Sequence, residues 1–400
     1  MSSMTKDVFR HSLTLIAWTS ALVAQAKPAD EAAPRAAIRV VKLKGTPHAR
    51  GVAHGKELKD EIHALVKLWK ADLKKTYGVD PDDFIARFRE KTDFETAIAK
   101  WTPGLLDEVR GIAEGCGIDY DTIYVFQLID EVWAQGKKIM TADKCTTIGV
   151  DHRGAQPTIV AQNLDIPRWY HGYQTLLHIT DEKAKLQTFV VTLPGLVGAN
   201  GMNSSRVGVC VNTLLQLRPS DDGLPVAFVV RGVLARKDWH KARAFLYDVR
   251  HASGQNYTIG GPDVAHAFEC SARRVTPCRP FGRATHTWHT NHPLVNTEWS
   301  GPFAKRAKQA GKDPKEMLRA CPRYELLEAR LGKEAVKNGK EVDLDSVLAA
   351  LRSKDSRVPI CNSHTFACTI MLLGPKPELR ISAGGADRNE LRVFRFDKAR

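Results

Sequence analysis

The 400-residue sequence lacks most of the patterns that would assign it to a common functional class. It has no Cys-x-x-Cys pair, so neither a zinc ribbon nor a thiol-exchange site is expected, and eight cysteines are too few for a disulfide scaffold. It has no phosphate-binding glycine loop and no Gly-x-Ser-x-Gly nucleophile elbow. After its first segment, no apolar run reaches the ~18 residues of a transmembrane helix. These absences argue against nucleotide-dependent, serine-esterase and membrane-spanning classes.

The sequence has fewer acidic than basic residues. It contains 59 Lys and Arg but only 45 Asp and Glu, which gives a net charge of +14. The basic residues are scattered over expected helix faces, as in Lys67-Leu68-Trp69-Lys70, rather than gathered in one tract. No RNA-recognition, zinc-finger or basic-zipper pattern accompanies them. A solvated basic surface is therefore favoured and no nucleic-acid partner is expected, although such a charge can also serve nucleic acid or an anionic surface.

The first 26 residues have the layout of a secretory signal peptide. A basic start precedes a mostly apolar run over residues 12–23, and Ala24-Gln25-Ala26 supplies small residues where a signal peptidase cuts. We therefore expect an exported protein, periplasmic or secreted. Its mature chain would begin near Lys27.

The chain changes character near residue 144. Residues 27–144 hold a strand-like segment at 37–43 and helical patterns at 57–77, 105–114 and 118–133. From residue 145 onward, short β-rich runs alternate with glycine turns. They are followed by helical patterns at 225–247 and 314–331 and by strands at the C-terminal end. This order predicts an α+β fold with helices packed on both faces of stacked antiparallel sheets.

Cys145 differs from the other cysteines in its neighbours. Most of the others are typical of small core residues, and export would permit one or two bridges, with Cys270–Cys278 and Cys361–Cys368 the nearest pairs. Cys145 opens an expected strand, and Asp165 closes the next one. A hairpin of this length brings Asp165 back beside Cys145, where its carboxylate can orient a group that carries the thiol proton.

Several motifs stand in a fixed order along the chain. They are Cys145-Thr146-Thr147, Asn163-x-Asp165, the segment Asn203 to Asn212, Thr290-Asn291-His292 and Pro322-Arg323-Tyr324, with glycine-containing segments at 45–55 and 108–115 ahead of them. Together they resemble the cysteine branch of the N-terminal-nucleophile hydrolases. The resemblance is to the penicillin acyltransferase-like (acyl-CoA:6-aminopenicillanic acid acyltransferase) family, and more distantly to the choloylglycine hydrolases. It runs from about residue 40 to the C-terminus.

This resemblance implies a domain plan and a set of site residues. It implies a four-layer αββα sandwich over 145–400, preceded by a helical pro-region or small subunit over 27–144. The catalytic set that it implies is Cys145, Asp165, Asn212, Asn291 and Arg323. Thr146 and Asn163 would support this set, and autocleavage would fall between Lys144 and Cys145.

Cleavage before Cys145 would supply the base that its thiol needs. A thiol with a pKa near ~8.5 is mostly protonated at pH 7 and needs a base. An α-amino group, with a pKa of ~7.7–8.0, is a suitable base, but Cys145 carries one only after its bond to Lys144 has been cut. Asn212 and Asn291 offer carboxamides to a developing oxyanion, an effect of roughly 3–4 kcal/mol for each donor.

His286, His289 and His292 form a spacing of three that suggests a metal site. On a strand, residues three apart lie on opposite faces, so these side chains cannot converge on one ion. No metal and no cofactor are therefore expected.

The sequence predicts a self-processing cysteine amidohydrolase or acyltransferase that acts on a small-molecule amide or N-acyl substrate through an acyl-thioester at Cys145. Hydrolysis is favoured over CoA-dependent transfer, because acyl-CoA is cytoplasmic and export is expected. The two fragments should stay associated. One alternative is a catalytically silent, exported binding protein with an unreactive Cys145. Another is a basic envelope- or nucleic-acid-binding protein with steep salt dependence.

Overall fold

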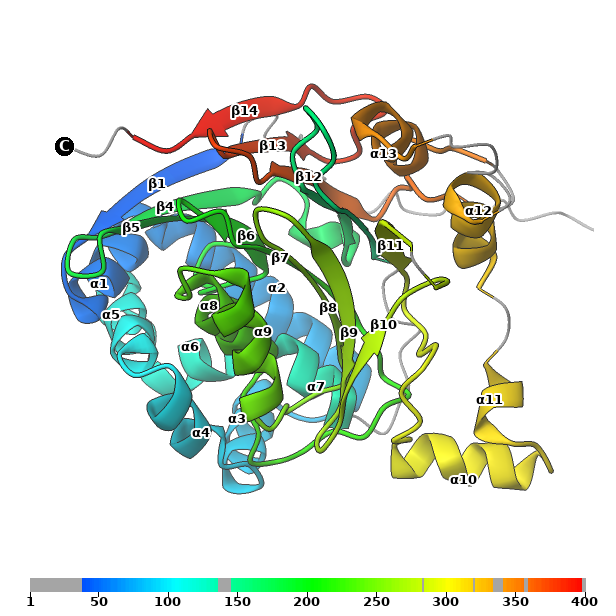
Figure 1. The fold of residues 1–400 in the computed structure, drawn as a ribbon. Helices are drawn as coiled ribbons and strands as arrows, with labels where there is room; N and C mark the ends of the chain where they lie inside the picture. Colours follow the sequence, from blue (N-terminus) through cyan, green and yellow to red (C-terminus); the bar gives the residue numbers. More distant parts are fainter. Residues whose placement is uncertain are drawn as a thin grey trace, which may run out of the picture. The chain divides into compact units, whose positions relative to one another are not determined.

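Two β-sheets stacked face to face form the centre of the protein (Figure 1). The computed structural model describes residues 38–135, 145–282, 284–318, 321–333, 341–355 and 359–397. Residues 35–400 form one compact unit. The expected signal peptide and Lys144 lie outside the described residues.

The larger sheet contains eight strands within the described ranges. In spatial order they are β1 (Arg39–Lys44), β4 (Thr175–Asp181), β5 (Leu186–Thr192), β6 (Asn200–Asn203), β7 (Gly208–Thr213), β8 (Gln255–Gly260), β9 (Ala265–Cys270) and β10 (Val275–Cys278). Neighbours are antiparallel except β1 and β4, which pair in parallel. The part of the chain ahead of Lys144 therefore supplies an edge strand of this sheet as well as helices.

The smaller sheet has six strands in the part of the chain that the structure describes, and all its neighbours are antiparallel. Their order is β11 (His286–His289), β2 (Thr146–Val150), β3 (Ile159–Asp165), β12 (Thr365–Leu372), β13 (Glu378–Ala383) and β14 (Arg392–Arg395). The expected hairpin of β2 and β3 is present, with Thr146 opposite Asn163 and Val150 opposite Ile159. On the other side of β3, Thr365 lies opposite Asp165.

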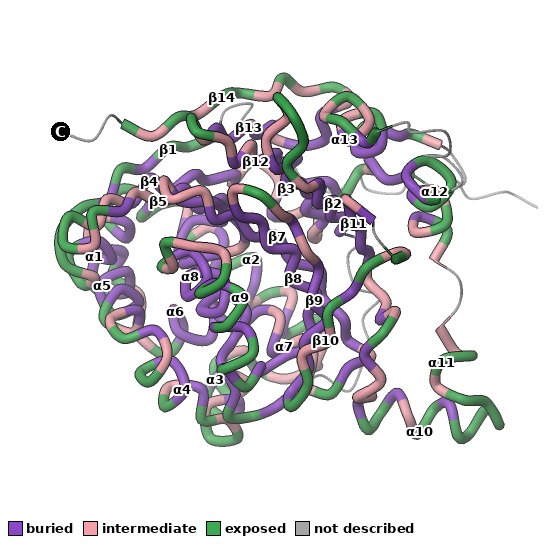
Figure 2. Tube along the Cα trace, in the orientation of Figure 1, coloured by how far each residue is buried: buried purple, intermediate pink, exposed green. Residues whose placement is uncertain are grey.

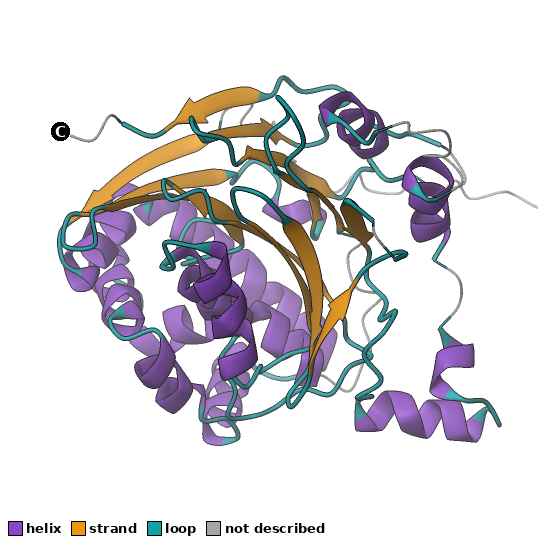
Figure 3. Ribbon diagram, viewed as in Figure 1, coloured by secondary structure: helices purple, strands orange, loops and turns teal. Residues whose placement is uncertain are grey.

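Helices cover the outer face of each sheet (Figure 3). Helices α8 (Val226–Leu234) and α9 (Trp239–Asp248) contact the larger sheet at β6, β7 and β8, whereas α12 (Pro322–Leu331) and α13 (Leu344–Leu351) contact β11 and β3 of the smaller one. Between the sheets, β2, β3 and β11 contact β7, β8 and β9. The expected four-layer αββα arrangement is confirmed.

The remaining helices are mostly in the N-terminal part of the chain. They are α1 (Pro47–Glu57), α2 (Lys59–Tyr77), α3 (Pro81–Glu90), α4 (Phe94–Trp101), α5 (Leu105–Cys116), α6 (Tyr120–Phe126), α7 (Ile129–Gln135), α10 (Gly301–Gln309) and α11 (Pro314–Met317). Three expected single helices, at 118–133, 225–247 and 314–331, are each two helices. In the first, the Gln127 side chain bonds to Gly195 and Val197 of the larger sheet's loop, and the helix ends there. In the others, Asp238 caps a new helix and Pro322 starts one.

Helices α1 and α5 cross with their backbones in contact. Gly51 and Gly55 of α1 face Gly111 and Gly115 of α5. A Cβ atom on Gly51 would lie 2.0 Å from the carbonyl oxygen of Glu108, and one on Gly111 would lie 2.3 Å from that of His48. Glycine is therefore required at this crossing.

The central strands are the most deeply buried part of the molecule, as Figure 2 shows. β2, β3, β7 and β8 are buried along their whole length. A second apolar cluster, with Ile148, Trp288, Leu327 and Val347, lies between the smaller sheet and helices α12 and α13. Burial of both sheet faces fixes the register of these strands, because a slip by one residue would turn each side chain to the opposite face.

Neither of the pairs nearest in sequence, Cys270–Cys278 and Cys361–Cys368, forms a disulfide. Among the described residues, no helix combines the length and the apolar composition needed to cross a membrane.

Candidate active site

Cys145 lies immediately before the first residue of β2, at the edge of the smaller sheet where the neighbouring strand β3 ends. It is 6% exposed, and its Sγ atom lies 3.6 Å from the backbone oxygen of Asp165. Both residues line one cavity. The structure thus places Asp165 beside Cys145, as the hairpin argument predicts.

Arg323 joins the expected site residues to one another. It lies in the first turn of α12, which begins at Pro322, and its side chain is buried. Nη1 donates to the backbone oxygen of Cys145 at 2.8 Å and to Oγ1 of Thr146 at 2.9 Å, and Nη2 donates to Oδ1 of Asn291 at 3.1 Å. The guanidinium therefore fixes the backbone at Cys145 and the orientation of the Asn291 amide.

Asn291 follows β11, which pairs with β2 and so runs beside the Cys145 strand. Its Oδ1 faces Arg323, so its amide nitrogen points the other way and donates to the backbone oxygen of Thr213 at 3.1 Å. An amide nitrogen carries two hydrogens. Asn291 is partly exposed, but it is not among the residues that line the cavity beside Cys145.

The Asp165 carboxylate is fully buried at the end of β3. Its Oδ2 accepts a hydrogen bond from Nδ2 of Asn362 at 2.8 Å. Asn362 precedes β12, and its own Oδ1 accepts from the backbone N–H of His364. The sequence did not point to Asn362, because an asparagine in a turn before a strand is common in any fold.

Asn212 and Asn163 bond to groups that pack around Cys145. Oδ1 of Asn212 accepts from Thr147 and from Asn256, each at 2.8 Å, and its Nδ2 lies 3.5 Å from the backbone oxygen of His289. Asn163 donates to the backbone oxygens of Leu351 and Ile360, toward helix α13. Both asparagines are fully buried.

The cavity beside Cys145 is mainly apolar. Side chains from both parts of the chain form its wall, among them Ile129, Trp133, Leu164, Leu193, Leu196 and Phe366. Such a surface binds a hydrocarbon group by removing it from water. A bound molecule in this cavity would have its apolar part next to the thiol.

Two acidic residues of α7, Asp130 and Glu131, were not among the expected site residues. Asp130 lines the cavity, and its Oδ1 accepts from Oγ1 of Thr213 at 2.5 Å and from Nε2 of Gln255 at 3.2 Å. Burial raises the pKa of Asp130. Burial and the neighbouring Asp130 charge raise the pKa of Glu131 to about 8. In the sequence, Asp130 and Glu131 are distinguished only by being two acidic residues within an otherwise apolar helical pattern.

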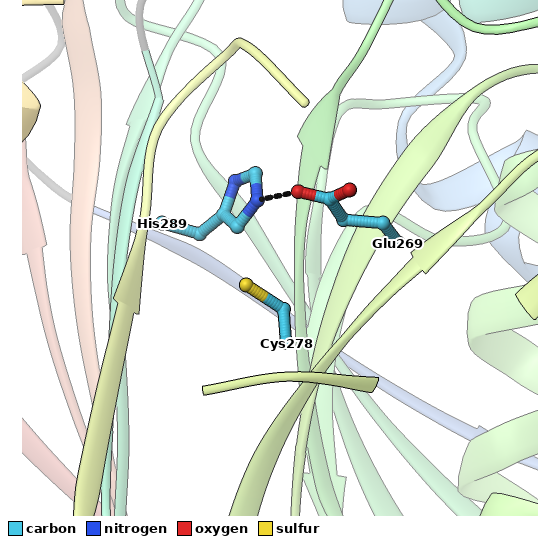
Figure 4. Close-up of side chains that lie close together, drawn as sticks. All are labelled: Glu269, Cys278 and His289. Carbon is cyan, nitrogen blue, oxygen red and sulfur yellow. Dashed lines mark hydrogen bonds and ion pairs between the residues drawn. The ribbon is translucent and has the colours of Figure 1, made fainter. Parts of the chain in front are cut away.

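Glu269, Cys278 and His289 have donor atoms that all lie within 4.8 Å of one another (Figure 4). Nε2 of His289 faces Oε1 of Glu269 at 2.8 Å, and Nδ1 faces the backbone oxygen of Thr290 at 2.7 Å. A carboxylate and a carbonyl both accept, so both ring nitrogens must carry hydrogen. Burial lowers the pKa of His289, but the hydrogen bonds to Cys278 and Glu269 outweigh it and raise the pKa to about 10. An imidazolium has no lone pair for a metal ion.

The expected divergence of the three histidines is also observed. Nε2 of His286 contacts the backbone oxygen of Leu331 in α12, on the face of β11 opposite to Glu269. His292 lies beyond the strand, with Nδ1 next to Oγ1 of Thr290. These three side chains do not form a common site.

The Glu269–His289 pair holds the loop that carries Asn291. Besides His289, the Glu269 carboxylate accepts the backbone N–H groups of Leu294, Val295 and Asn296. Asn291 lies between these two anchored points. The buried carboxylate therefore limits the movement of the Asn291 amide.

Comparison with known proteins matches residues 153–317 to the family model described as acyl-coenzyme A:6-aminopenicillanic acid acyl-transferase. The matched segment contains Asp165, Asn212 and Asn291 and excludes Cys145 and Arg323. The resemblance inferred from the motifs is confirmed in this segment. Among curated proteins, the chain is 29% identical over 110 residues to protein dcd1A of Dictyostelium discoideum, a match that spans 24% of this chain and 25% of that protein.

The fold is similar to those of several solved structures. An N-acylethanolamine-hydrolyzing acid amidase ortholog from Caenorhabditis elegans is 17% identical, with a TM-score of 0.41, and the match covers 63% of this chain and 100% of that one. A conjugated bile acid hydrolase mutant from Clostridium perfringens is 12% identical, with a TM-score of 0.37 and coverages of 63% and 98%. Penicillin V acylase from Agrobacterium tumefaciens is 11% identical, with a TM-score of 0.36 and coverages of 64% and 86%.

The family match therefore agrees with the resemblance that the motifs indicate, over less than half of the chain.

Proposed function

We propose that the protein hydrolyses a small-molecule amide and that Cys145 is its nucleophile, freed by cleavage of the Lys144–Cys145 bond. One observation carries the proposal: the Cys145 thiol lies in the wall of a mainly apolar cavity, while Arg323 ties the Cys145 backbone to the Asn291 amide. A nucleophile and a binding surface therefore lie together, and Arg323 links the nucleophile's backbone to a side-chain amide. These are the parts that acyl transfer requires.

Self-cleavage uses the same thiol. Sγ of Cys145 attacks the carbonyl carbon of Lys144, and the bond from that carbon to the Cys145 nitrogen breaks as this nitrogen gains the thiol proton, which leaves a thioester and a free α-amino group. Water then hydrolyses the thioester and restores the thiol. The products are a carboxylate at Lys144 and an N-terminal Cys145.

Turnover of a substrate repeats this chemistry on an external amide. The α-amino group accepts the thiol proton, and the thiolate attacks the amide carbonyl carbon. The second N–H of Asn291 donates to the oxyanion, and Asp165 holds the α-ammonium. The C–N bond breaks as the ammonium returns its proton to the leaving amine. Water cleaves the thioester to release the acid.

We assign Asn212 a positioning role in this scheme. Its contacts to Thr147 and to the backbone of His289 connect the nucleophile strand with the strand that leads to Asn291. We base hydrolysis rather than transfer to CoA, and an exported location, on the signal-peptide layout of residues 1–26. The two fragments remain together.

The test is processing and turnover in two cysteine variants. Cys145→Ala should leave the chain uncut and inactive, because it removes the only thiol that is adjacent to the scissile bond. Cys321→Ala is the informative comparison, because Cys321 is a second thiol near the site: burial raises its pKa, but His292 and Arg323 lower it to about 6. N-terminal sequencing of the wild-type large fragment should begin Cys-Thr-Thr, and activity is followed on a panel of N-acyl arylamides.

Two results would overturn the proposal. An active wild type that remains one uncut chain would exclude the mechanism, and a Cys145→Ala variant with normal turnover would move the nucleophile elsewhere. An uncut wild type that binds but never cleaves amides would instead favour the silent binding protein. Salt-dependent binding of nucleic acid without turnover would favour the third alternative.

A further inference from the structure

We propose that Asp130 selects substrates whose acyl group carries a hydrogen-bond donor, a hydroxyl or an ammonium, at the far end of an otherwise hydrocarbon chain. The inference rests on the proposed function, because it concerns the group bound to Cys145 as a thioester. It adds a specificity residue and a substrate class.

Most polar groups in the cavity wall are already bonded to the protein. Gln127 donates to the backbone oxygens of Ile123 and Gly195 and accepts from the backbone N–H of Val197. Oγ1 of Thr192 donates to the backbone oxygen of Leu196. All the donor hydrogens of these two side chains are used within the protein, and both residues are buried, so they offer a ligand little polar surface.

Asp130 differs from them. Both of its hydrogen bonds, from Thr213 and Gln255, end on Oδ1. Within the described ranges, no protein group bonds to Oδ2, and Asp130 retains some exposed surface in the cavity wall. One carboxyl oxygen is therefore open to the cavity. Once an acyl group has displaced water from the cavity, a carboxyl oxygen without a partner is unfavourable, so an acyl group that reaches Oδ2 with a donor gains relative to one that does not.

The position of Asp130 connects it to the reacting atoms. Thr213, which donates to Asp130, accepts at its backbone oxygen the Asn291 amide, and Asn291 accepts from Arg323. The acyl group attached to Sγ of Cys145 stays in the cavity after the amine has left, so the acyl rather than the amine part meets Asp130. Glu131, directly behind, faces Ser253 and the backbone N–H of Val226 and does not line the cavity.

The experiment compares acyl arylamides that are identical except for their terminal group. For each of a short series of chain lengths, kcat/KM is measured with a terminal methyl, hydroxyl or ammonium group, for the wild type, Asp130→Asn and Asp130→Leu. Asp151→Asn, which removes a half-buried carboxyl outside the cavity, is the matched control. Cleavage at Lys144–Cys145 reports whether each variant folds.

The wild type should prefer the hydroxyl and ammonium substrates over the methyl one by roughly tenfold or more at one chain length. Asp130→Leu should reverse this preference. Asp130→Asn can keep both protein hydrogen bonds on Oδ1, so it should retain the preference for the hydroxyl substrate and lose the preference for the ammonium substrate. This variant still tests the role of Asp130 if Asp130→Leu does not fold. Asp151→Asn should behave as the wild type.

The inference fails if the ratios among the three terminal groups are the same in the wild type and the Asp130 variants at every chain length. That result would leave the proposed function intact, because Cys145-dependent hydrolysis of the methyl substrate would persist. Failure of the proposed function looks different: no substrate in the panel would be cleaved by any form of the protein.

Discussion

At the scale of single residues, His289 illustrates how one buried charge can position a loop. Its ring donates to Glu269 on one side and to the Thr290 backbone on the other, so it is doubly protonated although it is fully buried. A charge in such a place is stable only when it is paired and hydrogen-bonded. The Glu269 carboxylate meets both conditions, since it also accepts three backbone N–H groups.

Raising the pH should therefore weaken the fold through His289. The pKa of its ring is about 10 in the folded protein and 6.5 as the ordinary value. A group whose pKa is raised by folding adds stability that is complete below pH 6.5 and is lost as the pH rises toward 10. Between these limits the wild type should lose up to about 1.4 kcal/mol per pH unit more than His289→Gln. Urea unfolding of both proteins at pH 7 to 10, in the uncut Cys145→Ala background, measures this difference.

Parallel pH dependences would mean that His289 is neutral in the folded protein. A lone pair would then be available on its ring, and the Glu269, Cys278 and His289 group would regain the ability to bind zinc. Titration of the same protein with Zn²⁺ tests this directly. No zinc-dependent rise in stability is expected from a histidine that donates from both nitrogens.

At the scale of the elements, the crossing of α1 and α5 depends on four glycines. Gly51→Ala places a methyl group against the backbone of Glu108, and a backbone oxygen cannot move aside as the end of a side chain can. The helices must separate, and we expect a loss of about 1–3 kcal/mol in the free energy of unfolding. Gly301→Ala, at a helix position with nothing within 4 Å, is the control and should be neutral or slightly stabilising. Thermal unfolding of the two variants and the wild type makes the comparison.

An equal effect of both substitutions would contradict this account of the crossing. The loss would then reflect the conformational freedom of glycine rather than the contact between helices.

Strand pairing near the site could be predicted from the sequence because it is local. The β2–β3 hairpin follows from two β-rich runs and the turn between them, and it alone is enough to bring Asp165 to Cys145. The helix breaks could not be predicted in the same way. Gln127 ends α6 by bonding to a loop that lies about 70 residues further along the chain. The periodicity of apolar residues within a helix does not indicate such a long-range contact.

The residues that form the site were predictable only in part, and for a related reason. Arg323 and Asn291 lie far from Cys145 in the sequence. Their assignment to the same site came from the family resemblance, not from the spacing of residues. Asp130 and Asn362 have roles that depend on what packs against them, namely a cavity and the Asp165 carboxylate. An acid in a helix and an asparagine in a turn look ordinary until that environment is known.

At the scale of the whole molecule, a buried ion cluster joins the parts of the chain before and after Cys145. Glu108 of α5 accepts from Arg231 of α8 at 2.6 and 3.0 Å and from Arg50 of α1 at 3.2 Å. Burial raises the pKa of Glu108, but the two arginines outweigh it and the pKa is lowered. The carboxylate thus stays charged, and its partner Arg231 belongs to the part that would become the large fragment.

Arg231→Leu should therefore loosen the association of the two fragments. It leaves the Glu108 charge underneutralised in the interior, a change that costs about 3–5 kcal/mol in comparable buried pairs. Arg250→Leu removes an exposed pair with Asp222 and should cost less than about 1 kcal/mol. Size-exclusion chromatography of the cut proteins in increasing urea should show dissociation at a lower urea concentration for Arg231→Leu alone. Coincident dissociation of both variants would assign the association to apolar contacts.

The parallel pairing of β1 with β4 affects how the chain folds. β1 is synthesised early, but β4 is synthesised only after the N-terminal helices, so β1 can join the sheet only at that later stage. While the chain is continuous, this meeting is an encounter within one molecule. Once the bond before Cys145 is cut, as we propose, the same meeting involves two molecules, and recovery after unfolding depends on their concentration. The mature protein would then hold a structure that it can keep but cannot readily rebuild at high dilution.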